Sequence, residues 1–198
     1  MRVPALIVVA VALLVAGCSS GKNKKPQPPA AATTTSTTAA PVARPLQVVL
    51  TTAARGPERG FNPSRAAKQV SPDIQRFVAR YLTVAFLQPA QAKKGWRDLL
   101  GMFDPSVRST ARRQLDSLSL GSAATKVTAV RPGKAQAHAV VLFSDGHPAA
   151  ATVRLSFDGT ADSAQGSGPV RLRSVLQLLR GQPGWRIAAY DSKTGGGT

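Results

Sequence analysis

Between residues 71 and 121, apolar side chains recur every three or four positions, which predicts amphipathic helices. The first helix is expected to start at Ser71-Pro72-Asp73, because this segment offers an N-cap, a first-turn proline and an acid beside the helix dipole. It is expected to end before Pro89. A second, short helix around 96–103 and a third between Asp104 and Gly121 complete the helical half.

From residue 126 onward the apolar period shortens to two, which predicts strands. Asp145-Gly146 is typical of a tight hairpin turn between two of them. The order of elements predicts an α+β fold, in which three N-terminal helices pack on a curved antiparallel sheet of about five strands. The folded domain is assigned to residues 65–192, and the Gly-rich residues 193–198 are expected to form a disordered tail. The expected strands cover residues 126–130, 135–143, 149–157, 170–179 and 184–191.

An apolar run over residues 3–16 follows a basic residue and has the length of a secretory signal. A transmembrane helix needs about 20 apolar residues, so this run is too short to span a bilayer. It ends in Val15-Ala16-Gly17-Cys18, which resembles a bacterial lipobox apart from Val15, where Leu is commoner. The resemblance implies that residues 1–17 are removed by cleavage between Gly17 and Cys18, and that Cys18 carries a lipid anchor with acyl chains such as palmitate. The alternative is an ordinary secretory signal with an incidental cysteine.

Residues 18–64 are rich in Pro, Thr and Ser and lack a periodic apolar face, so we expect a disordered tether. The threonine-rich run at 33–38 is a candidate for O-glycosylation. The apolar residues at 46–50 are interpreted as a local patch within this tether, and a short edge strand is the alternative. The expected location is the extracytoplasmic face of the cell membrane, with the domain displayed in the cell envelope.

The sequence carries 26 Lys and Arg against 9 Asp and Glu, a net charge of +17. This balance favours acidic partners such as anionic lipid headgroups or acidic wall polymers. Nucleic acid is not expected as a partner, because the protein is predicted to be exported and aromatic residues make up only 5% of the chain. Cys18 is the only cysteine, so no internal disulfide is expected to stabilise the domain.

A long helix, two shorter helices, an antiparallel meander and a last strand beginning Gly184-Trp185-Arg186-Ile187 resemble the nuclear-transport-factor-2-like cone. The ketosteroid-isomerase-like and SnoaL-like proteins share that fold, and the actinobacterial Mce-associated envelope proteins are similar in layout. The resemblance covers residues 72–192. It implies a cone-shaped domain, and the enzymes of this fold use Asp, His or Tyr inside the cone as general acid and base. Members often carry a strand between the second and third helices, and none is expected here.

Two groups of residues are candidate sites. His138 and Tyr81 are candidates for a pocket inside such a cone, because His138 has apolar neighbours of the same strand parity and Tyr81 lies on the apolar face of the first helix. Arg171 and Arg173 share one strand face, and Arg154 on the neighbouring strand joins them in a candidate surface for binding anions. Structural or solvated side chains are the alternative in both cases. No carboxylate pair, metal-ligand cluster or phosphate loop is recognisable, so no catalytic residue, metal or cofactor is predicted.

These observations predict a membrane-anchored lipoprotein that displays a non-catalytic binding domain in the envelope. Its partner would be an envelope protein, an apolar ligand in the cone, or an anionic lipid or wall polymer. A small isomerase or dehydratase that uses His138 is one alternative, and a structural subunit of an envelope transport complex is another. A pocket with a buried ionisable pair would favour the enzyme, an open apolar pocket would favour ligand binding, and a filled cone with an exposed apolar patch would favour complex assembly.

Overall fold

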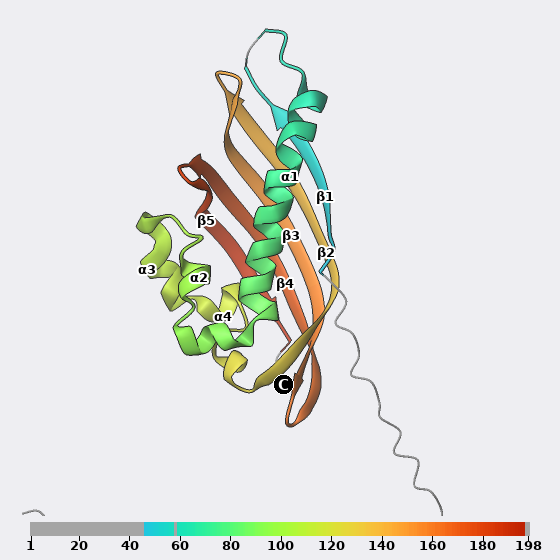
Figure 1. Cartoon of the computed structure of the whole chain (residues 1–198), viewed down its shortest axis with the longest axis vertical. Helices are drawn as coiled ribbons and strands as arrows, with labels where there is room; N and C mark the ends of the chain where they lie inside the picture. The colour runs from blue at the N-terminus through green and yellow to red at the C-terminus, as the bar shows by residue number, and fades with distance from the viewer. Residues whose placement is uncertain (1–45, 58, 197–198) are drawn as a thin grey trace, which may run out of the picture. The chain divides into compact units, whose positions relative to one another are not determined.

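The period-two half of the chain folds into four long strands joined by consecutive hairpins (Figure 1). The computed structural model describes residues 46–57 and 59–196. The predicted signal peptide, Cys18 with its cleavage site and the tether up to residue 45 lie outside the described residues. The four strands are β2 (Val127–Ser144), β3 (His147–Ser163), β4 (Gly166–Gly181) and β5 (Gly184–Gly195). Each pairs antiparallel with the next, and the sheet order is β1-β2-β3-β4-β5.

The fifth strand, β1 (Val48–Arg55), comes from the segment that was assigned to the tether. It pairs with β2 in parallel, from Val48 beside Ala135 to Arg55 beside Leu142. The sheet is therefore mixed, and the prediction of a wholly antiparallel sheet is wrong at this edge. Val48 and Ala54 are buried against the core, and this burial explains why the apolar patch forms a strand.

The long helix α1 (Pro63–Leu82) begins eight residues before the predicted start. Asn62 caps it, since its side chain accepts a hydrogen bond from the Arg65 amide at 3.0 Å and Pro63 occupies the first turn. Pro72 lies inside the helix, and Ser71 accepts a hydrogen bond from the Thr52 hydroxyl on β1 at 3.2 Å. The prediction chose the second of two cap-and-proline signals, and the first one starts the helix.

The other helical elements are shorter and more numerous than the two that were predicted. The predicted start of the third helix at Asp104 is confirmed, because the Asp104 carboxylate caps that helix by accepting a hydrogen bond from the Ser106 amide at 3.0 Å. The elements after α1 are η1 (Thr83–Leu87), η2 (Pro89–Lys94), α2 (Arg97–Leu100), α3 (Pro105–Arg113), α4 (Leu115–Leu118) and η3 (Gly121–Thr125). No helix among the described residues is long and apolar enough to cross a bilayer.

The outer edge of β5 is covered by the segment between α2 and α3. The Asp104 amide donates to the Ile187 carbonyl at 2.9 Å, and the Ile187 amide donates to the Met102 carbonyl at the same distance. The contact is a single isolated bridge between Phe103 and Ile187, and no full strand forms there among the described residues. Lys193 belongs to β5, and the Thr194 hydroxyl donates to the Ser117 carbonyl at 2.8 Å, so the predicted disordered tail is wrong at residues 193–195. Both contacts fasten the helical layer to the sheet.

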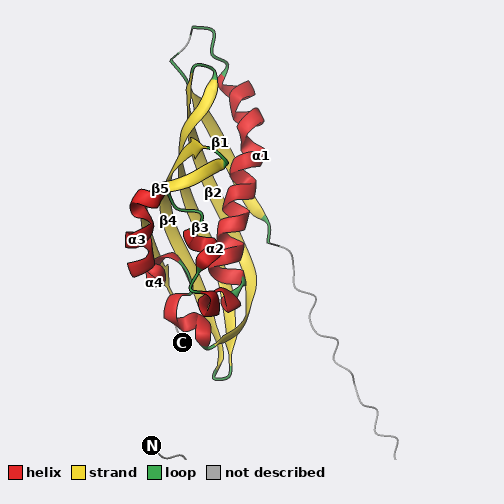
Figure 2. Ribbon diagram, turned by 60° about the vertical axis from the view of Figure 1, so that its left-hand side comes forward, coloured by secondary structure: helices red, strands yellow, loops and turns green. Residues whose placement is uncertain are grey.

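The helices lie on one face of the curved sheet and leave the other face uncovered (Figure 2). The covered side is filled with large side chains that are fully buried, among them Tyr81, Phe86, Phe103 and Phe157. The rings of Phe86 and Phe157 lie 5.4 Å apart between centroids. Burying each such side chain contributes about 1.5–3 kcal/mol, so this aromatic layer supplies much of the driving force for folding.

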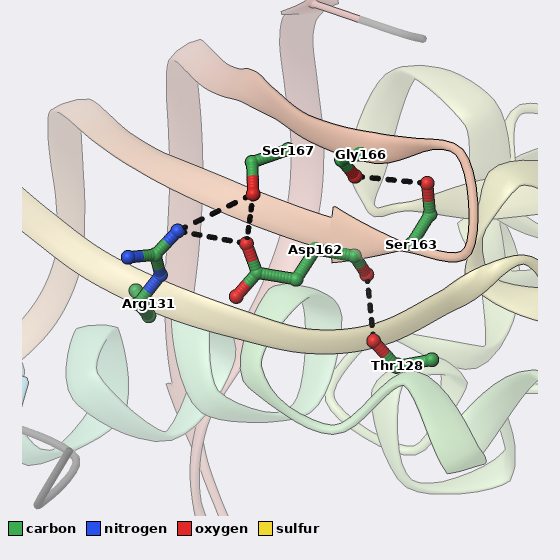
Figure 3. A network of polar contacts seen from close by, with 6 residues as sticks. All are labelled: Thr128, Arg131, Asp162, Ser163, Gly166 and Ser167. Carbon is green, nitrogen blue, oxygen red and sulfur yellow. Dashed lines mark hydrogen bonds and ion pairs between the residues drawn. The ribbon is translucent and has the colours of Figure 1, made fainter. Parts of the chain in front are cut away.

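A polar network fastens the ends of β2, β3 and β4 (Figure 3). The Arg131 guanidinium lies 2.7 Å from the Asp162 carboxylate, and the Ser167 hydroxyl donates to the same carboxylate. The Thr128 hydroxyl donates to the Asp162 carbonyl at 3.0 Å. The hydrogen bonds from Ser167 and Arg131 hold the pKa of the Asp162 carboxyl below its usual range.

Candidate functional site

The uncovered face of the sheet carries the candidate residues that the sequence analysis selected on the strands, which are His138, Arg154, Arg171 and Arg173. On β2 the buried positions are alanines such as Ala135 and Ala137, and the positions between them face outward. His138 is therefore on the uncovered face, directly opposite Arg154 on β3. The candidates from the two predicted sites thus meet on one surface.

Two neighbouring rows of outward side chains cross the strands and form a groove of about 420 Å³. Strand register places these side chains opposite one another, from β2 on one side to β5 on the other. The first row contains His138, Arg154, Val175 and Asp191, and the second contains Gln136, Ser156, Arg173 and Lys193. We name this the outer groove. Cations outnumber acids along it, and Gln136 and Ser156 add neutral hydrogen-bonding groups.

The arginines of the candidate anion surface differ in how far their charge is already compensated. The Arg173 guanidinium lies 3.2 Å from Asp158 and donates to the Leu172 carbonyl at 2.8 Å. Arg171 lies 3.9 Å from the same carboxylate and does not line the groove. Arg154 makes no ion pair with any described residue. The sequence singled out Arg171 and Arg173, whereas the structure makes Arg154 the cation most available to a ligand.

Tyr81 is far from this surface, on the opposite face of the sheet. It is fully buried, and its hydroxyl donates to the Leu118 carbonyl at 2.8 Å. Burial raises the pKa of the Tyr81 hydroxyl well above its usual value. The prediction that Tyr81 and His138 line one pocket is therefore wrong, because the apolar core separates them.

The interior holds few polar side chains. Of the described residues, the buried polar ones are Gln91, Ser119 and Ser174, and no described histidine or aspartate is buried. Buried aromatic side chains, among them Phe86 and Phe157, pack between the helices and the sheet.

Beside the outer groove lies an exposed apolar strip that the sequence analysis did not identify. Val140, Leu142 and Leu179 are 40%, 51% and 51% exposed. Leu142 and Leu179 are linked through Ala150 in the register of the sheet, so they form one row across β2, β3 and β4. The smaller alanines of β2 face inward because bulky partners such as Phe157, opposite Ala135, already fill the interior. In the sequence, small alanines alternate with larger residues such as Val140 and Leu142. If the alanines face the core, the larger apolar residues must face outward, and this alternation is the signal that could have revealed the strip.

The described residues thus form an α+β domain with an open mixed sheet, one covered face and a basic groove on the other. A scan against known protein families finds no match. A search of curated proteins finds none either. Among solved structures, the chain is similar to Rv3472 from Mycobacterium tuberculosis, a protein of unknown function, with 21% identity and a TM-score of 0.42. The similarity covers 69% of this chain and 78% of that one.

Proposed function

We propose that this protein is a lipid-anchored envelope protein whose folded domain binds an anionic polymer through the outer groove, without catalysing a reaction. The lipobox-like segment ending in Cys18 supports the anchor. The observation that carries the binding function is Arg154, an uncompensated cation that lines an open groove together with Arg173 and Lys193. The proposed location is the extracytoplasmic face of the cell membrane.

The shape of the outer groove favours an extended ligand. It crosses four strands and is open to solvent along the uncovered face, so a chain of repeating phosphates or carboxylates could contact several cations in succession. Gln136 and Ser156 would donate to anionic oxygens between the charged contacts. Acidic wall polymers have this chemistry, whereas a compact neutral ligand would leave the cations unused.

In this proposal the domain is a nuclear-transport-factor-2-like cone with a structural interior. The support is a helical layer on one face of a curved meander and a last strand in which Trp185 and Ile187 point into the core. Because aromatic side chains fill the interior, ligands bind on the surface of the cone. An isomerase or dehydratase that uses His138 would need a carboxylate beside it in an enclosed pocket, whereas His138 lies in an open groove on the uncovered face. In that groove Arg154 and Val175 stand between it and Asp191 in the strand register.

A second candidate function, a subunit of an envelope complex, is favoured by the apolar strip. Val140, Leu142 and Leu179 lie on the same uncovered face as the groove, and exposed apolar patches of this kind commonly mark protein interfaces. An acidic protein with an apolar contact surface would use both. A partner whose binding is abolished by Leu142→Asp with Leu179→Asp, and is unaffected by salt, would favour this function.

The anchor is tested by intact-mass measurement of the protein from membranes. We expect a chain that starts at Cys18 and carries acyl mass, and we expect Cys18→Ala to remain an uncleaved precursor or to leave the membrane fraction. A free thiol at Cys18 in the native protein would contradict the anchor.

The groove is tested with poly(glycerol phosphate) and the polypeptide of residues 18–198. We expect binding to weaken as salt rises, because the screening length falls from about 10 Å at 0.1 M to about 3 Å at 1 M. Arg154→Glu should weaken binding about fivefold or more, since an exposed ion pair contributes up to about 1 kcal/mol and reversal adds repulsion.

The matched control is Arg65→Glu, which changes the net charge equally on an exposed position of α1. Equal losses for Arg154→Glu and Arg65→Glu would show that net charge, rather than the groove, drives binding. Binding that is independent of salt would rule out the electrostatic mechanism.

A further inference from the structure

A second concave site lies on the helical side of the sheet, away from the outer groove. It is a cleft of about 620 Å³ between α1, the loop after α2 and the hairpin of β4 and β5. Because α1 forms one wall, the cleft opens on the covered side of the sheet, whereas the groove is on the uncovered side. The proposed function does not use this cleft.

The walls of the cleft combine apolar and cationic side chains. Phe77 from α1, Met102 from the loop and Trp185 from β5 supply apolar surface. The lining also contains one acid, Asp73, and four arginines, which are Arg76, Arg80, Arg180 and Arg186. An excess of cations beside apolar surface is the chemistry that recognises an anionic group attached to an apolar body.

Asp73 does not compensate all of these arginines. Its two oxygens are engaged by Arg76 at 2.7 Å and by Arg180 at 3.3 Å. Arg80 and Arg186 make no ion pair with any described residue. The pKa of the Asp104 carboxyl is lowered mainly by hydrogen bonds from Ser106, and the charge of Arg186 contributes to that lowering. Two guanidinium groups therefore remain available to an anion that enters the cleft.

Trp185, which lines the cleft, also carries an unpaired hydrogen-bond donor. Its indole Nε1 is buried and has no acceptor among the described residues. The Arg180 guanidinium carbon lies 5.3 Å from the centroid of the same ring. A buried donor without an acceptor is uncommon in folded proteins, because it loses its hydrogen bond to water and gains none in return.

We propose that this cleft binds a single-chain amphipathic anion, with its apolar body against Phe77 and Trp185 and its carboxylate or phosphate on Arg80 and Arg186. Planar guanidinium groups suit both head groups, since each presents paired oxygens. A free fatty acid and a monoacyl phosphate share this chemistry.

The test uses the polypeptide of residues 18–198 and isothermal titration calorimetry with four probes. Decanoate and decyl phosphate carry both features, decanol carries only the apolar chain, and inorganic phosphate carries only the charge. We expect saturable binding of one or both amphipathic anions, and binding at least roughly tenfold weaker for decanol and for inorganic phosphate. Decanoate and decyl phosphate distinguish a free fatty acid from a phosphorylated lipid as the source.

Arg80→Gln with Arg186→Gln should weaken decanoate or decyl phosphate binding roughly tenfold or more. The control is Arg112→Gln with Arg113→Gln, which removes the same charge from α3 and should leave binding unchanged. Trp185 fluorescence in a Trp96→Phe background should respond to the same ligand, because Trp96 lies outside the cleft.

Equal binding of decanol and decanoate, equal binding of inorganic phosphate and decyl phosphate, or an unaltered Arg80 and Arg186 double variant would each overturn the proposal. Arg154→Glu should leave decanoate and decyl phosphate binding intact. Failure at the cleft and failure at the outer groove are therefore separate results.

Discussion

At the scale of the residue, Arg154 and Arg173 show how neighbours decide what a charge can do. Both are on the uncovered face and both line the outer groove. Arg173 already has Asp158 and two backbone carbonyls as partners, so a ligand would compete with them. Arg154 has no such partner among the described residues, so a ligand would not compete with an existing ion pair. The two residues are equivalent in the sequence pattern but differ in the structure.

Asp162 gives a prediction about acid stability. Hydrogen bonds from Ser167 and Arg131 lower the pKa of its carboxyl in the folded state. A group with a lowered folded-state pKa stabilises the fold above its unfolded-state pKa, about 3.9 for Asp, and this stability is lost as pH falls through the folded-state value. We expect the melting temperature of the native chain to fall more steeply than that of Asp162→Asn between about pH 5 and pH 2.

The measurement is a series of thermal melts for both chains across that pH range. Asp191→Asn is the control, because Asp191 makes no ion pair with a described residue and its removal should preserve the native pH dependence. Identical slopes for the native chain and Asp162→Asn would show that the network in Figure 3 does not contribute to stability.

The role of Tyr81 could be predicted only in part from its position in the sequence. The apolar face of the first helix placed it correctly toward the core. The pattern did not reveal that the Leu118 carbonyl, 37 positions along the chain, would accept a hydrogen bond from the Tyr81 hydroxyl. A tyrosine with that partner is a packing residue, and this long-range contact removes it from the candidate site.

At the scale of the element, local signals predicted the hairpin at Asp145-Gly146 correctly, but the two strands expected at 126–130 and 135–143 are parts of the single strand β2. Asp145 and Gly146 both have positive φ values, 53° and 73°, as a tight hairpin turn requires. The start of α1 was harder, because Asn62-Pro63 and Ser71-Pro72 are equivalent as short motifs. The choice between them depends on Val70 and Ala66, which the fold buries. Burial is a property of the whole fold, so the motif could not decide it.

The strand β1 was missed for a related reason. Its partner residues on β2 lie 87 positions further along the chain, as in the pair Val48 and Ala135, and a parallel pairing leaves no turn signal between the two strands. The apolar run at 46–50 was visible in the sequence, but the edge of the sheet that receives it was not. The addition of Lys193 to β5 was missed because a Gly-rich end is typical of a disordered tail.

We predict slow amide exchange across β1. Residues 48–55 are paired with β2 along their whole length, so their hydrogen-bonded amides should be protected when the domain is folded. Hydrogen–deuterium exchange with peptide-level detection would measure this, with the same peptides in the denatured polypeptide as the fast-exchanging reference. Exchange across 48–55 as fast as in the denatured polypeptide would show that the segment is not a stable strand.

At the scale of the whole molecule, the two faces of the sheet carry different features. The covered face holds the aromatic layer and, at its rim, the arginine-lined cleft. The uncovered face holds the outer groove and the apolar strip. The sequence predicted a basic binding surface from strand parity, including Arg154 and Arg173. It could not predict that Asp158 would engage Arg171, because that contact depends on which strands become neighbours.

The most direct test of the account is to locate the anion on the folded protein. Titration of the isotope-labelled polypeptide of residues 18–198 with poly(glycerol phosphate), followed by amide chemical shifts, reports every contact at once. We predict that the largest shifts fall at Gln136, Arg154, Arg173 and Lys193, with α1 unchanged. Shifts confined to α1 and to the hairpin of β4 and β5, with the outer groove silent, would contradict the central claim.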